Sequence, residues 1–174
     1  MLEDLPQFVP QKACLSCDGC CRFKEQDSCW RPKMTQNEVD LHCSKEGGFS
    51  RAIFSKELES DGHIRAVRCH GQIKCSFFHL EDNMCHVYQN RPFECRLYPF
   101  LLMKEEEGLS VGVHLSCPHV QQYWGYEEFD HYVVKLQAYF QRQDVGDFLR
   151  ENISLGGDYT SYEAEIALIF PVVI

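Results

Sequence analysis

The chain has 174 residues, of which 44% are hydrophobic and 13% aromatic, enough to bury one sizeable core. Its formal net charge of −9 excludes the basic surface that nonspecific nucleic-acid binding needs. The longest apolar run, Ile166–Ile174, is far shorter than the roughly 20 residues that cross a bilayer. The composition therefore predicts a soluble protein with no membrane span and no nucleic-acid partner.

Short elements are predicted in the first part of the chain. Thr35 and Glu38 fit a capping box at the start of a helix that the glycines at 47–48 end. A second short helix is predicted over residues 50–58. Residues 63–69 alternate well enough to predict a strand.

The later part of the chain predicts a hairpin followed by helices. Strands are expected over 100–103 and 109–113, with a polar turn at 105–108 between them. Apolar residues then recur at helical spacing over 129–140, and another helix is predicted over 144–152. We therefore expect residues 120–174 to form a helical appendage.

Cysteine is the most informative residue type. Four of the eleven cysteines lie in one run, Cys14-Leu15-Ser16-Cys17-Asp18-Gly19-Cys20-Cys21. An odd number of cysteines cannot all pair, and adjacent cysteines bridge only with strain, so a disulfide scaffold is the weaker alternative. The N-terminal residues show no basic or apolar region of a signal peptide, which indicates a reducing cytoplasm. The run predicts a cytoplasmic metalloprotein.

A second group of motifs makes the first more specific. Cys75 is followed by aromatic residues, a Tyr-x-x-Arg-Pro-x-x-Cys-Arg-x-Tyr-Pro stretch covers residues 88–99, and Cys117-Pro118 closes the pattern. Together these motifs resemble the CxxCxxCC cysteine-cluster family of YkgJ-type zinc- or iron-chelating proteins. The resemblance extends to the cysteine-cluster region of flagellin lysine N-methylases, but no methyl-donor site is recognisable here.

The resemblance implies a set of metal ligands. They are Cys14, Cys17, Cys20, Cys21, Cys75, Cys85, Cys95 and Cys117. Cys43 is interpreted as a small apolar residue on a helix face, and Cys29 and Cys69 as spare candidates. Arg91 and Arg96 are expected to support the cofactor by hydrogen bonds to the cysteines or by charge.

Four histidines lie within three residues of a cysteine, namely His70, His86, His114 and His119. Any one of them could complete a metal site, although a surface or supporting role is expected for each.

The identity of the metal stays open at this level. Four thiolates suit both zinc and iron–sulfur clusters. Neighbouring side chains diverge, so Cys20 and Cys21 are suited to two metal centres or to two corners of one cluster. A single zinc ion would also leave several of eight thiolates unused. These arguments favour an iron–sulfur cluster of the 4Fe-4S kind, with zinc as the alternative.

Three functions are compatible with these residues. The first is a cytoplasmic iron–sulfur protein acting in electron transfer or as an accessory subunit. The second is a metal-dependent enzyme of group transfer, including methyl transfer, and the third is a zinc-stabilised interaction module without catalysis. No Gly-rich phosphate loop and no GxSxG motif is present, so nucleotide-dependent and hydrolase chemistry have no support.

The fold expected from these elements is α+β. Residues 1–119 are expected to form a small irregular domain organised by metal, with short hairpins and helices, on which the appendage at 120–174 packs. The apolar tail, Ile166–Ile174, must either pair as a strand within the chain or dock onto a protein partner.

Overall fold

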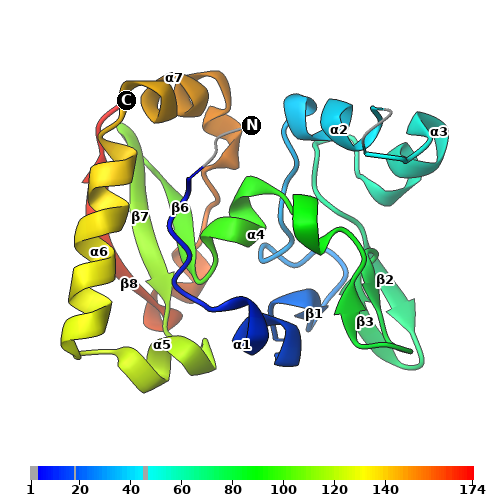
Figure 1. The fold of residues 1–174 in the computed structure, drawn as a ribbon, viewed down its shortest axis with the longest axis horizontal. Helices are drawn as coiled ribbons and strands as arrows, with labels where there is room; N and C mark the ends of the chain where they lie inside the picture. The colour runs from blue at the N-terminus through cyan, green and yellow to red at the C-terminus, as the bar shows by residue number, and fades with distance from the viewer. Residues whose placement is uncertain (1–3, 18, 45–46) are drawn as a thin grey trace. The chain divides into compact units, whose positions relative to one another are not determined.

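The computed structural model of the chain describes residues 4–17, 19–44 and 47–174. It is α+β, with helices and several small antiparallel sheets, which confirms the predicted fold class (Figure 1). The chain divides into two compact units. We call Gln11–Cys95 the cysteine unit, and Leu2–Pro10 together with Arg96–Ile174 the sheet unit. The predicted division at residues 119 and 120 is a different one and stays a prediction.

The cysteine unit is built from very short elements. Its three-stranded antiparallel sheet has the order β1-β3-β2, and a second sheet pairs β4 with β5. Its helices are α1 (Gln11–Ser16), α2 (Gln36–His42) and α3 (Arg51–Phe54), and its strands are β1 (Arg22–Phe23), β2 (Ala66–Cys69), β3 (Gln72–Cys75), β4 (Phe78–His79) and β5 (Met84–Cys85). Helix α4 (Phe93–Leu97) follows, at the end of this unit in sequence.

The capping box predicted for α2 is present. The Thr35 hydroxyl accepts a hydrogen bond from the Glu38 backbone N–H, and the Glu38 carboxylate accepts one from the Thr35 backbone N–H. The helix ends at His42, before the predicted glycines, and residues 45–46 of the predicted helix lie outside the described residues. The second predicted helix is α3, which continues as a single 3-10 turn over Ser55–Glu57.

The cysteine unit has its own apolar core, into which several cysteines pack. The buried residues are Met34, Phe54, Ile64, Cys75, Phe77, Phe78 and Val87. Cys21, Cys43 and Cys85 lie against this core as partly buried side chains. The sulfur-bearing residues are therefore part of what this small unit buries.

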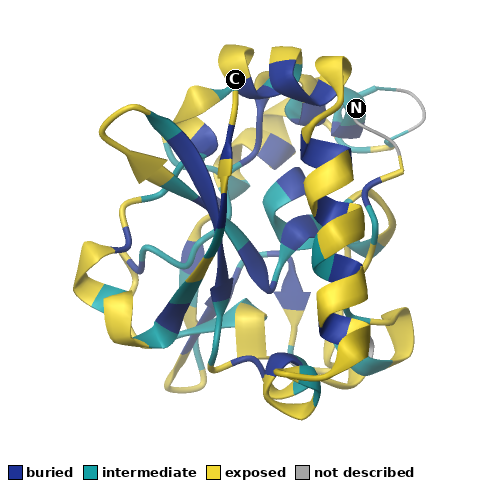
Figure 2. Cartoon of the chain, turned by 90° about the vertical axis from the view of Figure 1, so that its left-hand side faces the viewer, coloured by how far each residue is buried: buried dark blue, intermediate teal, exposed yellow. Residues whose placement is uncertain are grey.

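The sheet unit contains the longer elements. Its antiparallel sheet has the order β6-β7-β8, and helix α6 runs along it (Figure 1). Its strands are β6 (Phe100–Glu105), β7 (Gly108–His114) and β8 (Ile166–Val172), and its helices are α5 (Pro118–Tyr123), α6 (Glu127–Phe140) and α7 (Gln143–Glu151). Both strands of the predicted hairpin and both predicted helices are confirmed. The buried residues of α6 recur along one face, and its other face is exposed (Figure 2).

The apolar tail pairs within the chain as β8, beside β7. The register of this pair shifts between Val111 and Gly112. A Cβ atom at Gly112 would lie 2.5 Å from the Met103 sulfur and 2.7 Å from Ile166 Cγ2, so a larger residue here would have to displace these two side chains. On β8, Leu168 remains 63% exposed.

The N-terminal segment belongs to the sheet unit because it packs into that unit's aromatic core. The ring of Phe8 lies 4.9 Å from that of Tyr132 and 5.5 Å from that of Phe129, measured between centroids. The Tyr132 hydroxyl donates a hydrogen bond to the Pro6 carbonyl oxygen over 2.9 Å. In the described part of the chain, no helix is long and apolar enough to cross a membrane.

Tyr139 offers a stability test within this core. Its hydroxyl oxygen is buried without a hydrogen-bond partner among the described residues, and burial raises its pKa to about 12. Tyr139→Phe is therefore expected to leave the free energy of unfolding in urea unchanged or to raise it by up to about 1 kcal/mol. Tyr132→Phe, which removes the bond to Pro6, is the control and is expected to lose about 1 kcal/mol.

The raised pKa of Tyr139 also predicts how the stability of the protein changes at alkaline pH. Its pKa in the folded protein lies above the unfolded value of about 10, so the folded state holds this proton more tightly. Its contribution to stability should fall as the pH rises from about 10 to about 12, and Tyr139→Phe should lack that contribution. A clear loss of stability in Tyr139→Phe at neutral pH would contradict this account.

Candidate metal centre

The N-terminal cysteine run folds as a short helix followed by a 3-10 turn. Cys14 lies in α1, the Cys17 backbone N–H donates to the Cys14 carbonyl oxygen over 3.2 Å, and residues 19–21 form the 3-10 turn. Asp18 lies outside the described residues. The sulfur atoms of Cys20 and Cys21 lie 4.0 Å apart, close to the roughly 3.8 Å between thiolates that share a tetrahedral ion with 2.3 Å bonds.

Three further cysteines come from separate elements of the same unit. Cys75 ends β3 and is buried, and Cys85 ends β5, opposite Phe78 of β4. Cys95 lies in α4. All of these cysteines are free thiols.

Neighbouring cysteines are among the causes of the raised pKa values of five of these thiols. The thiols of Cys20, Cys75 and Cys85 face Cys95 closely enough to raise its pKa, which burial already raises well above the ordinary value. Burial also raises the pKa of Cys75 to about 12, with further contributions from Cys85 and Cys20.

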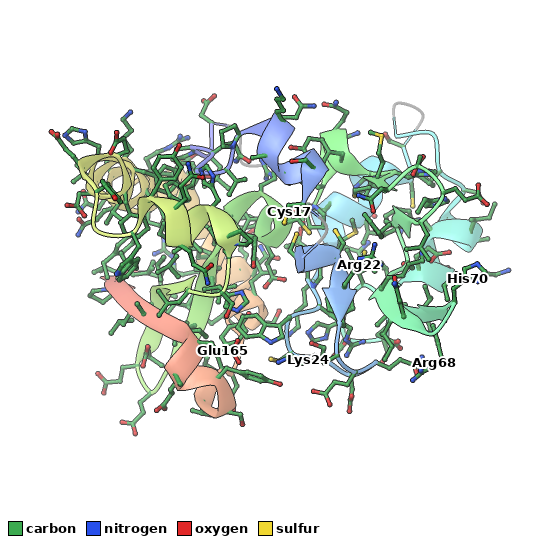
Figure 3. The ribbon with its side chains drawn as sticks, turned by 90° about the horizontal axis from the view of Figure 1, so that it is seen from below. Cys17, Arg22, Lys24, Arg68, His70 and Glu165 are labelled. Atoms are coloured by element: carbon green, nitrogen blue, oxygen red, sulfur yellow. The ribbon has the colours of Figure 1, made fainter. Side chains whose placement is uncertain are left out.

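Three more of these thiols, those of Cys21, Cys14 and Cys85, also have raised pKa values. The pKa of Cys21 rises most through its sulfur contact with Cys20, and next through burial. Burial raises the pKa of Cys14 and of Cys85, and Cys20 adds to both. Cys17 also contributes to the raised pKa of Cys14, and Figure 3 labels its side chain. Groups whose pKa values are raised in this way stay neutral thiols at neutral pH unless a positive charge lies among them.

Arg91 supplies part of that positive charge. Its Nη1 atom lies 3.8 Å from the Cys14 sulfur, and its guanidinium lies 4.1 Å from the centroid of the Tyr88 ring. Its charge lowers the pKa of Cys14 and of Cys85, against the effect of burial. Arg91 therefore lies where the sequence places a supporting residue, and its role toward a cofactor stays a prediction.

Two of the predicted site residues belong to the sheet unit. Cys117 is buried as the residue that precedes α5, and Arg96 lies near Tyr139, whose pKa its charge lowers. The structure thus brings together seven of the eight predicted ligands within one unit, and the membership of Cys117 in the same centre stays a prediction.

The remaining cysteines lie elsewhere in the cysteine unit. Cys43 follows α2 and packs against the apolar core, in keeping with its interpretation as a small apolar residue. Cys69 ends β2 opposite Gln72, and Cys29 lies in the loop before α2. Neither is among the main causes of the raised pKa values of Cys14, Cys21, Cys75, Cys85 and Cys95.

The histidines predicted near cysteines have other partners. His86 Nε2 lies 3.0 Å from the Asp82 carboxylate, and His114 Nδ1 lies 2.9 Å from the Tyr98 hydroxyl. His70 lies in the exposed turn between β2 and β3, and the ring of His119 lies 5.0 Å from that of Phe8. These contacts agree with supporting roles.

Helix α4, which carries Cys95, is fixed to α2 by a buried carboxylate. Oε1 of Glu38 accepts a hydrogen bond from the Phe93 backbone N–H over 2.6 Å, while its Oε2 accepts from Thr35. The Glu94 carboxylate accepts a hydrogen bond from the Lys33 backbone N–H. The sequence analysis identified Glu38 only as a capping residue, because nothing in its spacing shows a contact 55 residues away.

Glu38→Ala is expected to lower the free energy of unfolding by about 2 to 4 kcal/mol, since it removes the cap and leaves buried N–H donors unpaired. Asp40→Ala, on the same helix but at an exposed ion pair with Arg51, is the control and should cost less than about 1 kcal/mol. Chemical denaturation of both variants checks this. Equal losses would show that the link between α2 and α4 contributes little.

The donor set fits a thiophilic metal. Seven of the predicted ligands are free thiols of one unit, and thiolate sulfur is the donor that zinc and iron–sulfur clusters take. In residues 4–17, 19–44 and 47–174, however, no group of three or more His, Cys, Asp or Glu side chains is arranged so that it could hold a metal ion. The fit therefore rests on donor chemistry and charge, and not on coordination geometry.

The fold and the thiol cluster define a small α+β domain with a cysteine-rich site for zinc or iron. Residues 13–122 match the model of the CxxCxxCC family, described as a "putative zinc- or iron-chelating domain", and the chain belongs to this family. No curated protein and no solved structure matches the chain. The family confirms the predicted resemblance and supports metal binding, with zinc and iron both named.

Proposed function

We propose that this chain is a cytoplasmic iron–sulfur protein that acts in electron transfer or as an accessory subunit. The observation that carries the proposal is the number of thiols in one unit: seven of the predicted ligands are free thiols of the cysteine unit, whereas one zinc ion takes four ligands. All eleven cysteines are free thiols, which is in keeping with a reducing compartment.

Different residues of the chain would have different roles toward a cluster. Cys75 and Cys95 would bind it on the side away from solvent, and Arg91 would offset negative charge on the sulfur atoms. When bound, an iron–sulfur cluster supplies a one-electron carrier.

The exposed cysteines suggest where a redox partner would approach. Cys17 and Cys20 are exposed, whereas Cys75 is buried. The solvent-facing side of the centre would therefore be the N-terminal run, which a partner can reach without opening the core. Figure 3 shows Cys17 and Arg22 in this part of the unit.

Metal and sulfide analysis tests the proposal. The full chain would be purified without oxygen, and iron, zinc and acid-labile sulfide would be measured per polypeptide together with the visible absorption spectrum. Iron with matching sulfide and a reversible loss of colour on reduction is the expected result. Zinc without sulfide would overturn it and favour a zinc-stabilised module.

A further inference from the structure

Basic side chains gather at one end of the β1-β3-β2 sheet. Arg68 is exposed on β2, His70 is exposed in the turn between β2 and β3, and Lys24 is exposed just after β1. The antiparallel register of the three strands places all three residues within about two positions of the β2–β3 turn. Figure 3 labels these side chains on the cysteine unit.

Arg22 extends this group toward the thiols. It is the residue that follows Cys21, and its guanidinium donates a hydrogen bond to the side chain of Gln72, the last paired residue of β3 before the turn. The guanidinium also lies 5.2 Å from the centroid of the Phe78 ring. These contacts direct the Arg22 charge to the turn end of the sheet. We call Arg22, Lys24, Arg68 and His70 the basic end.

Few carboxylates lie near the basic end in sequence. Residues 62–80 contain no aspartate or glutamate. Glu25 and Asp27 follow Lys24 in the loop after β1, but in the described part of the chain neither forms an ion pair with Lys24 or Arg68. Lys24 and Arg68 therefore present positive charge to solvent.

The charge of the chain is divided unevenly between the two units. The sheet unit has fourteen acidic residues against five lysines and arginines, whereas the cysteine unit has twelve of each. The whole net charge of −9 thus lies in the sheet unit. An approaching negative surface would be repelled by the sheet unit and attracted by the basic end.

The basic end lies close to the candidate metal centre. Strand β3 begins at Gln72 and ends at Cys75, so the two ends of this strand are about 10 Å apart. Cys17 and Cys20, which precede β1, are exposed. A protein that docks on the basic end would therefore lie beside the exposed part of the thiol cluster.

We propose that the basic end is the docking surface for an acidic patch on a redox partner protein. The partner's redox role rests on the electron-transfer function proposed above. Electron-transfer complexes are small and weak, and opposite charges steer them together. Four side chains at one end of a sheet suit such a contact better than a nucleic acid, which needs many phosphate contacts and would meet the net charge of −9.

Calorimetric titration of the metal-loaded full chain with a plant-type ferredoxin of acidic surface tests the docking surface without requiring electron transfer. Binding should weaken at least about tenfold between about 0.01 M and about 0.15 M salt, as the Debye length shortens from about 30 Å to about 8 Å. Arg68→Glu should weaken binding at low salt by about threefold to tenfold. Lys24→Glu, a second exposed position, should act in the same direction.

A matched control separates the basic end from net charge alone. Lys135→Glu changes an exposed lysine of α6 and shifts the net charge equally, and it should alter ferredoxin binding less than about twofold. Cytochrome c, a carrier of positive surface, should not lose affinity in Arg68→Glu. Ferredoxin binding that does not depend on salt, equal losses in Arg68→Glu and Lys135→Glu, or tighter binding of single-stranded DNA than of ferredoxin would overturn the docking surface.

The result is separable from the test of the metal centre. A chain that holds iron and sulfide but does not bind the ferredoxin would overturn the docking surface alone. A chain that holds zinc without sulfide but binds the ferredoxin through Arg68 would support the docking surface and overturn the electron-transfer function.

Discussion

Removal of the bound metal is expected to unfold the cysteine unit while the β6-β7-β8 sheet keeps its structure. The strands of the cysteine unit are two to four residues long, and Cys75 is itself part of the buried core. Short strands of this kind are marginal without further support. Structural metal sites contribute about 10 kcal/mol or more, comparable with the whole stability of a domain.

Hydrogen exchange measured by mass spectrometry checks this expectation. A thiophilic chelator would be added without oxygen and with a reductant present, and metal release would be confirmed on the same sample. Amides of β3 should lose their protection, whereas those of β7, the central strand of its sheet, should keep theirs. The chelator already saturated with zinc is the control. Full protection of β3 after complete metal release would show that the fold does not need metal.

Cys95→Ser is expected to cause a large loss of metal, and Cys43→Ser almost none. Cys95 faces the thiols of Cys75, Cys20 and Cys85, whereas Cys43 packs against the apolar core. Losing one ligand weakens a thiolate site, and the neighbouring thiols would lose the metal's positive charge. Loss of a structural metal should cost about 3 kcal/mol or more of stability.

The two variants are compared by measuring their metal content per polypeptide and their midpoints of thermal unfolding. Cys43→Ser exchanges one partly buried cysteine for serine in the same unit, so it controls for the loss of a thiol as such. Full metal content in Cys95→Ser, with unaltered stability, would remove Cys95 from the ligand set. If Cys43→Ser lost as much metal and stability as Cys95→Ser, the core of the unit would be sensitive to any cysteine substitution, and Cys95 would not be distinguished as a ligand.

Sequence patterns predicted the helices and strands that depend on residues close to one another in the chain. The capping box of Thr35 and Glu38 is complete, and the regular spacing over 129–140 gave helix α6. The hairpin around the turn at 105–108 followed from apolar runs on either side of a polar turn. These features depend on residues a few positions apart.

Features that depend on distant contacts were beyond sequence reasoning. Nothing in the pattern around Phe8 shows that it packs with Tyr132 in the sheet unit, or that Glu38 holds α4. The thiol cluster was predicted because close spacing of cysteines carries its own chemistry.

The helix predicted to run up to the glycines at 47–48 is shorter in the structure, where it ends at His42. The prediction placed the end of the helix at the first glycines, but the backbone turns away before them. Cys43 already closes α2, with its N–H donating to the Val39 and Leu41 carbonyl oxygens. The positive φ that a stop signal needs occurs only later, at Gly48.

The order in which the two units lie along the chain has a consequence for biogenesis. Residues 11–95 are made before β6, β7 and β8, so the cysteine unit can leave the ribosome and acquire metal while the sheet is still being synthesised. Phe8, by contrast, must wait for Phe129 and Tyr132, which are translated more than a hundred residues later. The exposed thiols of the cysteine unit would thus be available to metal before the second core closes.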